Sequence, residues 1–339
     1  MTKISGSSLC KHAQVACFVI LIVYTISLLS SNDNRVLSSK SSVPSDAMTL
    51  TPNDNSNQPF ISLERQNQWI ENEFKAADPH EQEWCVQALK EGTYWKKSIV
   101  TSTETTRQNG AQFGQDIFIA RNLFMKDIMN DKKGFYVEAG ANHYKTISST
   151  WFYDKCLGWD GLCVEPQERY QDDIRKYRSC TLVPMCITKE RIDMIFESSK
   201  NPGAGMQVRP MGPEGVPEGW TKVECASLND IMAMYAGDRT YVDLFILDVE
   251  GEETNVLNSI NWDNLSFGAI LIEDGRIPNP KRMDYQFSMK GYLRFHMLSI
   301  DSLYVRRKQQ QLWYPPDWQS FESIMSHRAY KDPSLLGSF

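Results

Sequence analysis

The sequence lacks several signals that would assign a function directly. It has no C-x-x-C pair, which argues against a structural zinc site. It has no excess of basic residues either: 36 lysines and arginines against 42 acidic residues leave a net charge of −6, and the pI is near 5.5. Because a nucleic-acid binder carries a basic face, DNA and RNA are not expected partners. No internal repeat is visible, which argues against a solenoid.

Charged residues are absent from residues 13–32, a stretch that is dense in Val, Ile, Leu and Phe. About 20 such residues can cross a bilayer as a helix. Lys3, Lys11 and His12 precede the stretch and favour a cytosolic tail over residues 1–12. The alternative is a cleaved signal peptide, although no A-x-A-like cleavage site follows. We predict a single-pass type II membrane protein of the Golgi or endoplasmic reticulum, with a secreted protein as the alternative.

The chain beyond this anchor divides by composition. Residues 33–59 are mostly Ser, Asn, Pro and Asp, with too few large apolar side chains to fold, which predicts a disordered stem. Residues 60–110 contain apolar residues at helical spacing and predict a helical collar. The main domain is expected over residues 111–310 and a C-terminal extension over 311–339. With 41% hydrophobic residues, the chain can bury a real core.

Six cysteines lie on the lumenal side of the predicted anchor: Cys85, Cys156, Cys163, Cys180, Cys186 and Cys225. Residues 180–188 read as one extended strand, which puts Cys180 and Cys186 roughly 20 Å apart. That separation is too large for these two to bridge each other. Disulfides elsewhere are compatible with an oxidising lumen, but their pairing cannot be read from the sequence.

From residue 111 onward, apolar runs alternate with helical patterns. The expected strands cover residues 134–140, 161–166, 180–188, 243–251 and 267–274, and helices are expected over 146–158, 167–179, 227–237 and 252–260. Strands and helices that alternate in this way predict a parallel sheet with helices on both faces. Residues 292–307 read instead as an antiparallel hairpin at one edge. Five parallel strands and a closing hairpin are the arrangement of Rossmann-like class I methyltransferases, an α/β fold with a mostly parallel seven-stranded sheet.

Polar residues stand at the ends of two neighbouring expected strands. Ligands of an open α/β sheet bind beyond the carboxyl ends of the strands. Gly140 follows the first strand, where a missing side chain allows close approach to a ligand, and Glu165 ends the second, where a carboxylate can accept both hydroxyls of a ribose. The turn after Gly140 is not G-x-G-x-x-G, which argues against NAD. Glu138 suits a cationic amino-acid group, and S-adenosylmethionine combines such a group with a ribose.

Five blocks of the sequence resemble the FkbM-type methyltransferases: "GQDIFIARNLF", "GFYVEAGANHYKTISSTWF", "LGWDGLCVEPQERY", "ECASLNDIM" and "DLFILDVEGEETNVL". The resemblance spans residues 111–306 and implies S-adenosylmethionine-dependent O-methylation of sugar or polyketide hydroxyls. It also implies which residues bind the cofactor: Gln115, Asp116, Glu138, Gly140, Asn142, Glu165, Cys186 and Ile187. Asp248, Glu250 and Gly251 match the "DVEG" block. Tyr144 departs from the glycine usual in the family, and its bulk is expected to narrow the methionine end of the pocket.

Several roles stay open at this stage. Asp248 could orient the acceptor hydroxyl, act as general base or hold a divalent cation with Glu250, although no metal site is predicted. His143 could take the acceptor proton, or lie exposed in the turn. Glu138 and Glu165 could instead cap the helices that follow them, as could Gln115 and Asp116. Two residues that end the fifth strand, Glu273 and Asp274, could face the substrate.

The predicted function is a methyltransferase that O-methylates a glycan or another small lumenal hydroxyl compound. One alternative is a type II glycosyltransferase that uses the acid pair Asp248 and Glu250 to hold a metal and a nucleotide sugar. Another is a non-catalytic member of the fold that serves in binding or trafficking, for which Tyr144 is the best support. Residues 198–220 form a Gly- and Pro-rich segment of the length expected for a lid. The acceptor and the oligomeric state are not set by the sequence.

Overall fold

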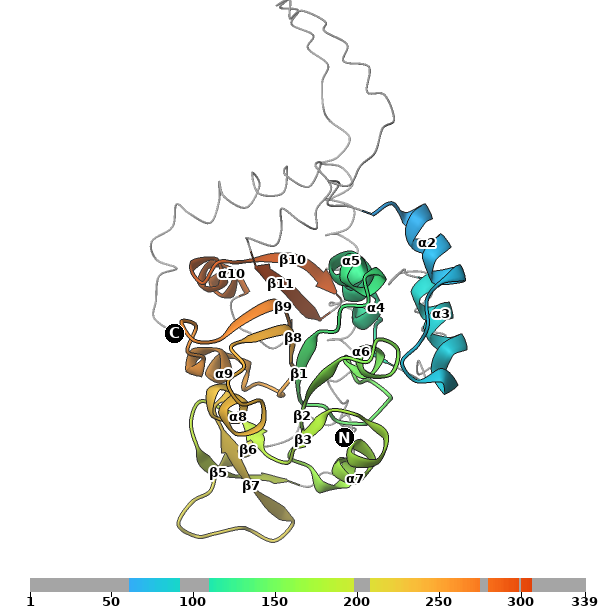
Figure 1. Cartoon of the computed structure of the whole chain (residues 1–339). Helices are drawn as coiled ribbons and strands as arrows, with labels where there is room; N and C mark the ends of the chain where they lie inside the picture. Colours follow the sequence, from blue (N-terminus) through green and yellow to red (C-terminus); the bar gives the residue numbers. More distant parts are fainter. Residues whose placement is uncertain (1–60, 92–109, 198–207, 275–279, 299, 307–339) are drawn as a thin grey trace, which may run out of the picture. The chain divides into compact units, whose positions relative to one another are not determined.

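The computed structural model describes residues 61–91, 110–197, 208–274, 280–298 and 300–306 (Figure 1). The predicted cytosolic tail, membrane anchor, stem and C-terminal extension all lie outside these ranges. Within them, every helix is too short or too polar to span a bilayer.

The main sheet has seven strands in the order β10-β11-β9-β8-β1-β2-β3 (Figure 1). Its strands are β1 (Phe135–Ala139), β2 (Asp160–Val164), β3 (Thr181–Val183), β8 (Tyr241–Leu247), β9 (Ser266–Glu273), β10 (Tyr292–Leu298) and β11 (Asp301–Arg306). Strands β9, β8, β1, β2 and β3 pair in parallel, whereas β11 is antiparallel to both of its neighbours. The predicted mixed α/β fold with a mostly parallel seven-stranded sheet is confirmed. Residues 292–306 form an antiparallel hairpin at one edge of the sheet, in which β11 is inserted between β9 and β10.

Helices cover both faces of this sheet and define two apolar cores (Figure 1). The helices are α4 (Gln115–Ile119), α5 (Met125–Met129), α6 (Trp151–Lys155), α7 (Glu168–Tyr177), α8 (Leu228–Tyr235), α9 (Glu253–Ser259) and α10 (Pro280–Met289). A π-helical turn, η2 (Ala120–Phe124), joins α4 to α5. The first four helices contribute to one core, and α8, α9 and α10 to the other. Each helix has apolar residues along one side only, so it buries that side against the face of the sheet on which it lies. The helices on the two faces therefore form two separate cores.

A second, four-stranded sheet was not predicted. It has the order β4-β7-β5-β6 and consists of β4 (Cys186–Ile187), β5 (Ile192–Glu197), β6 (Val208–Pro210) and β7 (Trp220–Ala226). The prediction of one strand over residues 180–188 is wrong, because β3 ends at Val183 and β4 belongs to this other sheet. Pro184 lies between them and has no N–H with which to continue the ladder. Part of the predicted lid, residues 198–207, lies outside the described residues.

Two helices lie in the predicted collar, α2 (Leu63–Asn72) and α3 (Gln82–Glu91), with a short 3-10 turn, η1 (Pro79–Glu81), before α3. Ile70 and Leu89 are fully buried against the first core. A disulfide between Cys85 and Cys156 joins α3 to the end of α6. Four further cysteines form two more disulfides, Cys163–Cys180 and Cys186–Cys225. Cys180 and Cys186 each bond to another cysteine, so the prediction that they do not bridge each other is confirmed.

Candidate active site at the carboxyl ends of the strands

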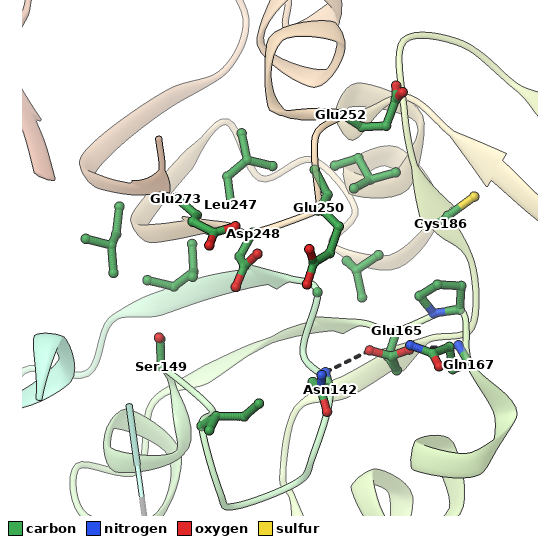
Figure 2. A pocket seen from close by; sticks show the side chains of 18 of the residues that line it. Asn142, Ser149, Glu165, Gln167, Cys186, Leu247, Asp248, Glu250, Glu252 and Glu273 are labelled. Atoms are coloured by element: carbon green, nitrogen blue, oxygen red, sulfur yellow. Dashed lines mark hydrogen bonds between the residues drawn. The ribbon is translucent and has the colours of Figure 1, made fainter. Parts of the chain in front are cut away.

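A cavity of about 170 Å³ opens beyond the carboxyl ends of β1, β2, β8 and β9 (Figure 2). It lies where the strand order reverses, between β1 and β8, which is the usual ligand site of an open α/β sheet. Eight of the residues predicted to form the site line it: Gln115, Gly140, Asn142, Glu165, Cys186, Ile187, Asp248 and Glu250. Glu138, Asp116 and His143 are not part of the lining.

Glu165 is held in place by two backbone groups. One carboxylate oxygen accepts the Asn142 N–H at 2.7 Å (dashed in Figure 2), and the other accepts the Gln167 N–H at 2.8 Å. The side chain is almost fully buried, and this burial raises its pKa to about 7. Because an ionised carboxylate offers about four lone-pair positions, two remain for donors from a ligand. The geometry therefore fits a group that presents paired hydroxyls at this edge of the cavity.

Gly140 lines the cavity and also allows a neighbouring strand to approach β1. Its φ is 86°, in the left-handed region that glycine adopts freely. A Cβ at this position would overlap the backbone carbonyl oxygen of Asp248. The Asp248 N–H also donates to the Ala139 carbonyl at 3.1 Å, so the ends of β1 and β8 lie against each other. Glycine is therefore required here for the approach of a neighbouring strand, and its predicted contact with a ligand stays a prediction.

The carboxylate of Glu138 is hydrogen-bonded to groups of the protein and does not line the cavity, which differs from its predicted contact with the cofactor. Its carboxylate accepts the Ser149 N–H at 2.6 Å, the Thr150 hydroxyl at 2.6 Å and the Ser148 hydroxyl at 3.0 Å. Arg178 lies 3.6 Å away, and Glu138 is buried. These donors directly precede α6, so Glu138 has the helix-capping role that was the alternative reading. The same contacts explain why α6 begins only at Trp151, later than predicted.

Three other residues that were expected at the cavity have side chains that do not line it: His143, Tyr144 and Asp116. His143 uses Nδ1 to accept the N–H groups of Lys145 and Thr146, and so stabilises its own turn. Tyr144 packs on Tyr177, with ring centroids 4.7 Å apart, and it does not line the cavity, so the expected narrowing is not found. Asp116 is buried and accepts the N–H groups of residues 111 and 117. In a short turn, the sequence alone does not tell which way a side chain points.

Carboxylates gather at the ends of β8 and β9. Oxygen atoms of Asp248, Glu253 and Glu273 all lie within 4.8 Å of one another, and Figure 2 shows Asp248, Glu250 and Glu273 along the same wall. Asp248 is open to the solvent that fills the cavity, but the surrounding walls limit its hydration. Limited hydration, together with the charge of Glu273, raises the pKa of Asp248 to about 8.

The spacing of these three acids is compatible with a metal ion. One of them, Glu253, already accepts hydrogen bonds from the backbone. Glu253 is buried, and one of its oxygens accepts the N–H groups of Val249 and Gly251 at 3.0 and 3.1 Å. It therefore holds the turn that leads into α9. Of the three, this leaves Asp248 and Glu273 with side chains directed to the cavity.

Asp301 is a member of the site that the sequence did not reveal. It begins β11 and lies in register opposite Glu273 of β9. Gln115 donates its side-chain amide to the Asp301 carboxylate, which joins the start of α4 to this wall of the cavity. Burial raises the pKa of Asp301 to about 7. Only the insertion of β11 beside β9 brings Asp301 here, and no local sequence signal reports that insertion.

Ile147 lines the cavity in an unfavourable backbone conformation. Its φ is 61°, which is a strained value for a β-branched residue, and 44% of its surface is exposed. The chain on both sides is tied down, by the Thr146 N–H to His143 and by Ser148 to Glu138. Strained residues of this kind gather at functional sites, and Ile147 lines the cavity.

Replacing Ile147 with glycine is expected to stabilise the protein relative to the Ile147→Ala variant by about 1 kcal/mol, because only glycine removes the left-handed strain. Both variants delete the same exposed side chain, so alanine serves as the matched control. The free energies of unfolding in urea would measure this difference. An alanine variant as stable as the glycine variant would show that the backbone is not strained.

Comparisons with known proteins add little to this geometry. No protein-family model and no curated protein matches the sequence. Among solved structures, the crystal structure of the methyltransferase FkbM from Methylobacillus flagellatus KT is similar, with 14% sequence identity and a TM-score of 0.30. The match covers 51% of this chain and 43% of that one, so the chain spans less than half of the solved protein. A similarity this distant assigns no activity.

Proposed function

We propose that this protein is an S-adenosylmethionine-dependent methyltransferase that O-methylates a hydroxyl of a glycan or another lumenal metabolite. The observation that carries the proposal is the pairing of Glu165 and Asp248 in one cavity at the switch point of the sheet. Glu165 supports it because it has lone pairs left for a ribose, and Ile187 because it adds a buried apolar wall for the adenine. Cys186, Asn142 and the turn at Gly140 border the same part of the cavity.

In this reaction the protein has two tasks: to hold the acceptor hydroxyl in line with the methyl group, and to accept the hydroxyl proton. S-adenosylmethionine supplies a methyl group on a positively charged sulfur. Transfer of this methyl group to the acceptor oxygen would leave a neutral thioether, and Glu165 and Ile187 would hold the nucleoside while it occurs. The hydroxyl proton passes to the Asp248 carboxylate. Alignment of the reacting atoms contributes most of the rate enhancement, and the base assists loss of the proton.

Replacing Glu165 with alanine is expected to weaken binding of S-adenosylhomocysteine by about 30- to 1,000-fold. Two hydrogen bonds to a charged acceptor are lost, each worth about 1.5–3 kcal/mol, and the loss is partly offset because less charge is buried. Calorimetric titration of the full chain with S-adenosylhomocysteine measures the effect. Glu168→Gln is the control, because Glu168 is exposed on the first turn of α7 and does not line the cavity.

The same titration tests the proposed function. A wild-type protein that gives no heat with S-adenosylhomocysteine would refute it. Binding of a nucleoside diphosphate together with Mn²⁺ would instead favour the glycosyltransferase alternative, for which the spacing of Asp248, Glu253 and Glu273 is the supporting observation. Binding of S-adenosylhomocysteine without methylation of any glycan in a broad screen would favour a binding or trafficking role.

The proposed setting is the lumen of the secretory pathway, with the chain anchored by residues 13–32 or secreted. Support comes from the three disulfides, since such bonds persist in oxidising compartments. Separation of cell membranes from soluble lumenal contents would distinguish an anchored chain from a secreted one.

A further inference from the structure

The cavity is far more acidic than the chain as a whole. Among the described residues that line it, six are acidic, namely Glu165, Asp248, Glu250, Glu252, Glu273 and Asp301, and one is basic, Arg169. Over the whole sequence the two signs are nearly balanced, at 42 to 36. Such an imbalance within one concave site creates a field that favours a positively charged ligand.

The acidic residues divide into two groups within the cavity. Glu165 is stabilised by two backbone N–H groups and by the nearby charge of Arg169. Asp248, Glu273 and Asp301 lie together at the ends of β8 and β9 and the start of β11. Within the described part of the chain, none of these three forms an ion pair with a lysine, arginine or histidine. Restricted hydration raises the pKa of Asp248, and the charge of Glu273 raises it further.

The surroundings of this second group favour an organic cation over a bare metal ion. Gln115 already donates to Asp301, and Glu253 is bonded to the backbone of its own turn. Leu271 and Ile300 line the cavity beside these acids, and Ile300 is 41% exposed. A divalent metal prefers an all-oxygen shell, whereas an ammonium group on a hydrocarbon skeleton matches carboxylates next to apolar surface.

We propose that the methyl acceptor is an amino alcohol, a small hydroxyl compound that also carries a protonated amino group. The inference rests on the proposed function, because it assigns Glu273 and Asp301 to the acceptor's ammonium and Asp248 to its hydroxyl. The ammonium nitrogen has no lone pair and is a recognition handle, while the hydroxyl oxygen is the nucleophile. Methylation of the oxygen leaves the ammonium unchanged, and the hydroxyl proton goes to Asp248.

The test compares cationic probes with neutral ones of the same skeleton. The full chain, saturated with S-adenosylhomocysteine, is titrated at pH 8 with 3-aminopropanol against 1,3-propanediol and with ethanolamine against ethylene glycol, since both amines are protonated at this pH. At least one amine is expected to bind about tenfold or more tightly than its neutral counterpart, because its ammonium group can form a charge-assisted hydrogen bond to a carboxylate. Asp301→Asn and Glu273→Gln should each remove most of that advantage. Asp238→Asn removes an exposed charge remote from the lining and should keep it.

Three results would overturn the inference while leaving the proposed function intact. The first is equal binding of the amine and the neutral compound in both pairs. The second is a loss of S-adenosylhomocysteine affinity in Glu273→Gln and Asp301→Asn as large as the loss of amine affinity, which would assign these acids to the cofactor. The third is saturable binding of Mn²⁺ that excludes the amines. Failure of the proposed function itself is distinguishable, because S-adenosylhomocysteine would then not bind to the wild type.

Discussion

Replacing Asp248 with asparagine is expected to lower turnover of the best acceptor by about 10²- to 10⁴-fold, the usual contribution of a positioned general base. The affinity for S-adenosylhomocysteine should stay within a few-fold, because Glu165, rather than Asp248, has the lone pairs suited to the ribose. Asparagine keeps the size of the side chain and the backbone contacts between β8 and β1, so the cavity should keep its shape. The change removes only the group that accepts the proton.

The dependence of kcat on pH provides a second readout. Restricted hydration and the charge of Glu273 raise the pKa of Asp248 to about 8, and the base must be ionised to accept a proton. Turnover of the wild type should therefore rise as the pH passes through about 8, and this step should vanish in Asp248→Asn. Asp238→Asn, at the opposite end of β8, is the matched control and should behave as the wild type does. If turnover of Asp248→Asn stayed within threefold of wild type, Asp248 would not be the base.

Replacing Arg178 with alanine is expected to destabilise the fold by about 3–5 kcal/mol, which is the range for breaking a buried ion pair by removing one partner. The Arg178 side chain is fully buried and donates to Asp154 at 2.6 Å, Thr150 at 2.7 Å and Ser148 at 2.9 Å. Without it, Asp154 and Glu138 would both stay in the interior without a cation. Because Ser148 and Thr150 flank residues that line the cavity, binding of S-adenosylhomocysteine should weaken as well.

Urea denaturation with tryptophan fluorescence would measure this loss. Arg175→Ala is the matched control on the same helix: its ion pair with Asp172 is largely exposed, so a change below about 1 kcal/mol is expected. The deficit of Arg178→Ala should shrink as the pH falls, because burial raises the pKa of Glu138 and protonation of this carboxylate removes a buried charge that has lost its cation. A loss below 1 kcal/mol for Arg178→Ala would show that the hydroxyl and backbone donors alone satisfy Glu138 and Asp154.

Local patterns were sufficient for the parallel part of the sheet. The runs that became β1, β2, β8 and β9 are apolar and short, and they alternate with stretches of helical period. An apolar run buried on both faces has few other ways to satisfy its backbone. The carboxyl ends of parallel strands meet at one edge, so Glu165 and Asp248 could be placed in the same cavity from strand ends alone.

Features that depend on contacts between segments far apart in the sequence could be seen only in the tertiary structure. The orientation of Glu138 follows from Arg178, which lies 40 positions later and has no signal near β1. The second sheet arises because Pro184 interrupts one strand and residues far along the chain offer a new partner. Asp301 reaches the cavity only because β11 pairs with β9, and the three disulfides depend on the same packing. By itself, the sequence determined the strands β1, β2, β8 and β9, the helices between them and the edge at which their polar ends meet, because a short apolar run or a helical stripe is a local pattern. The partners of each side chain were set by long-range packing.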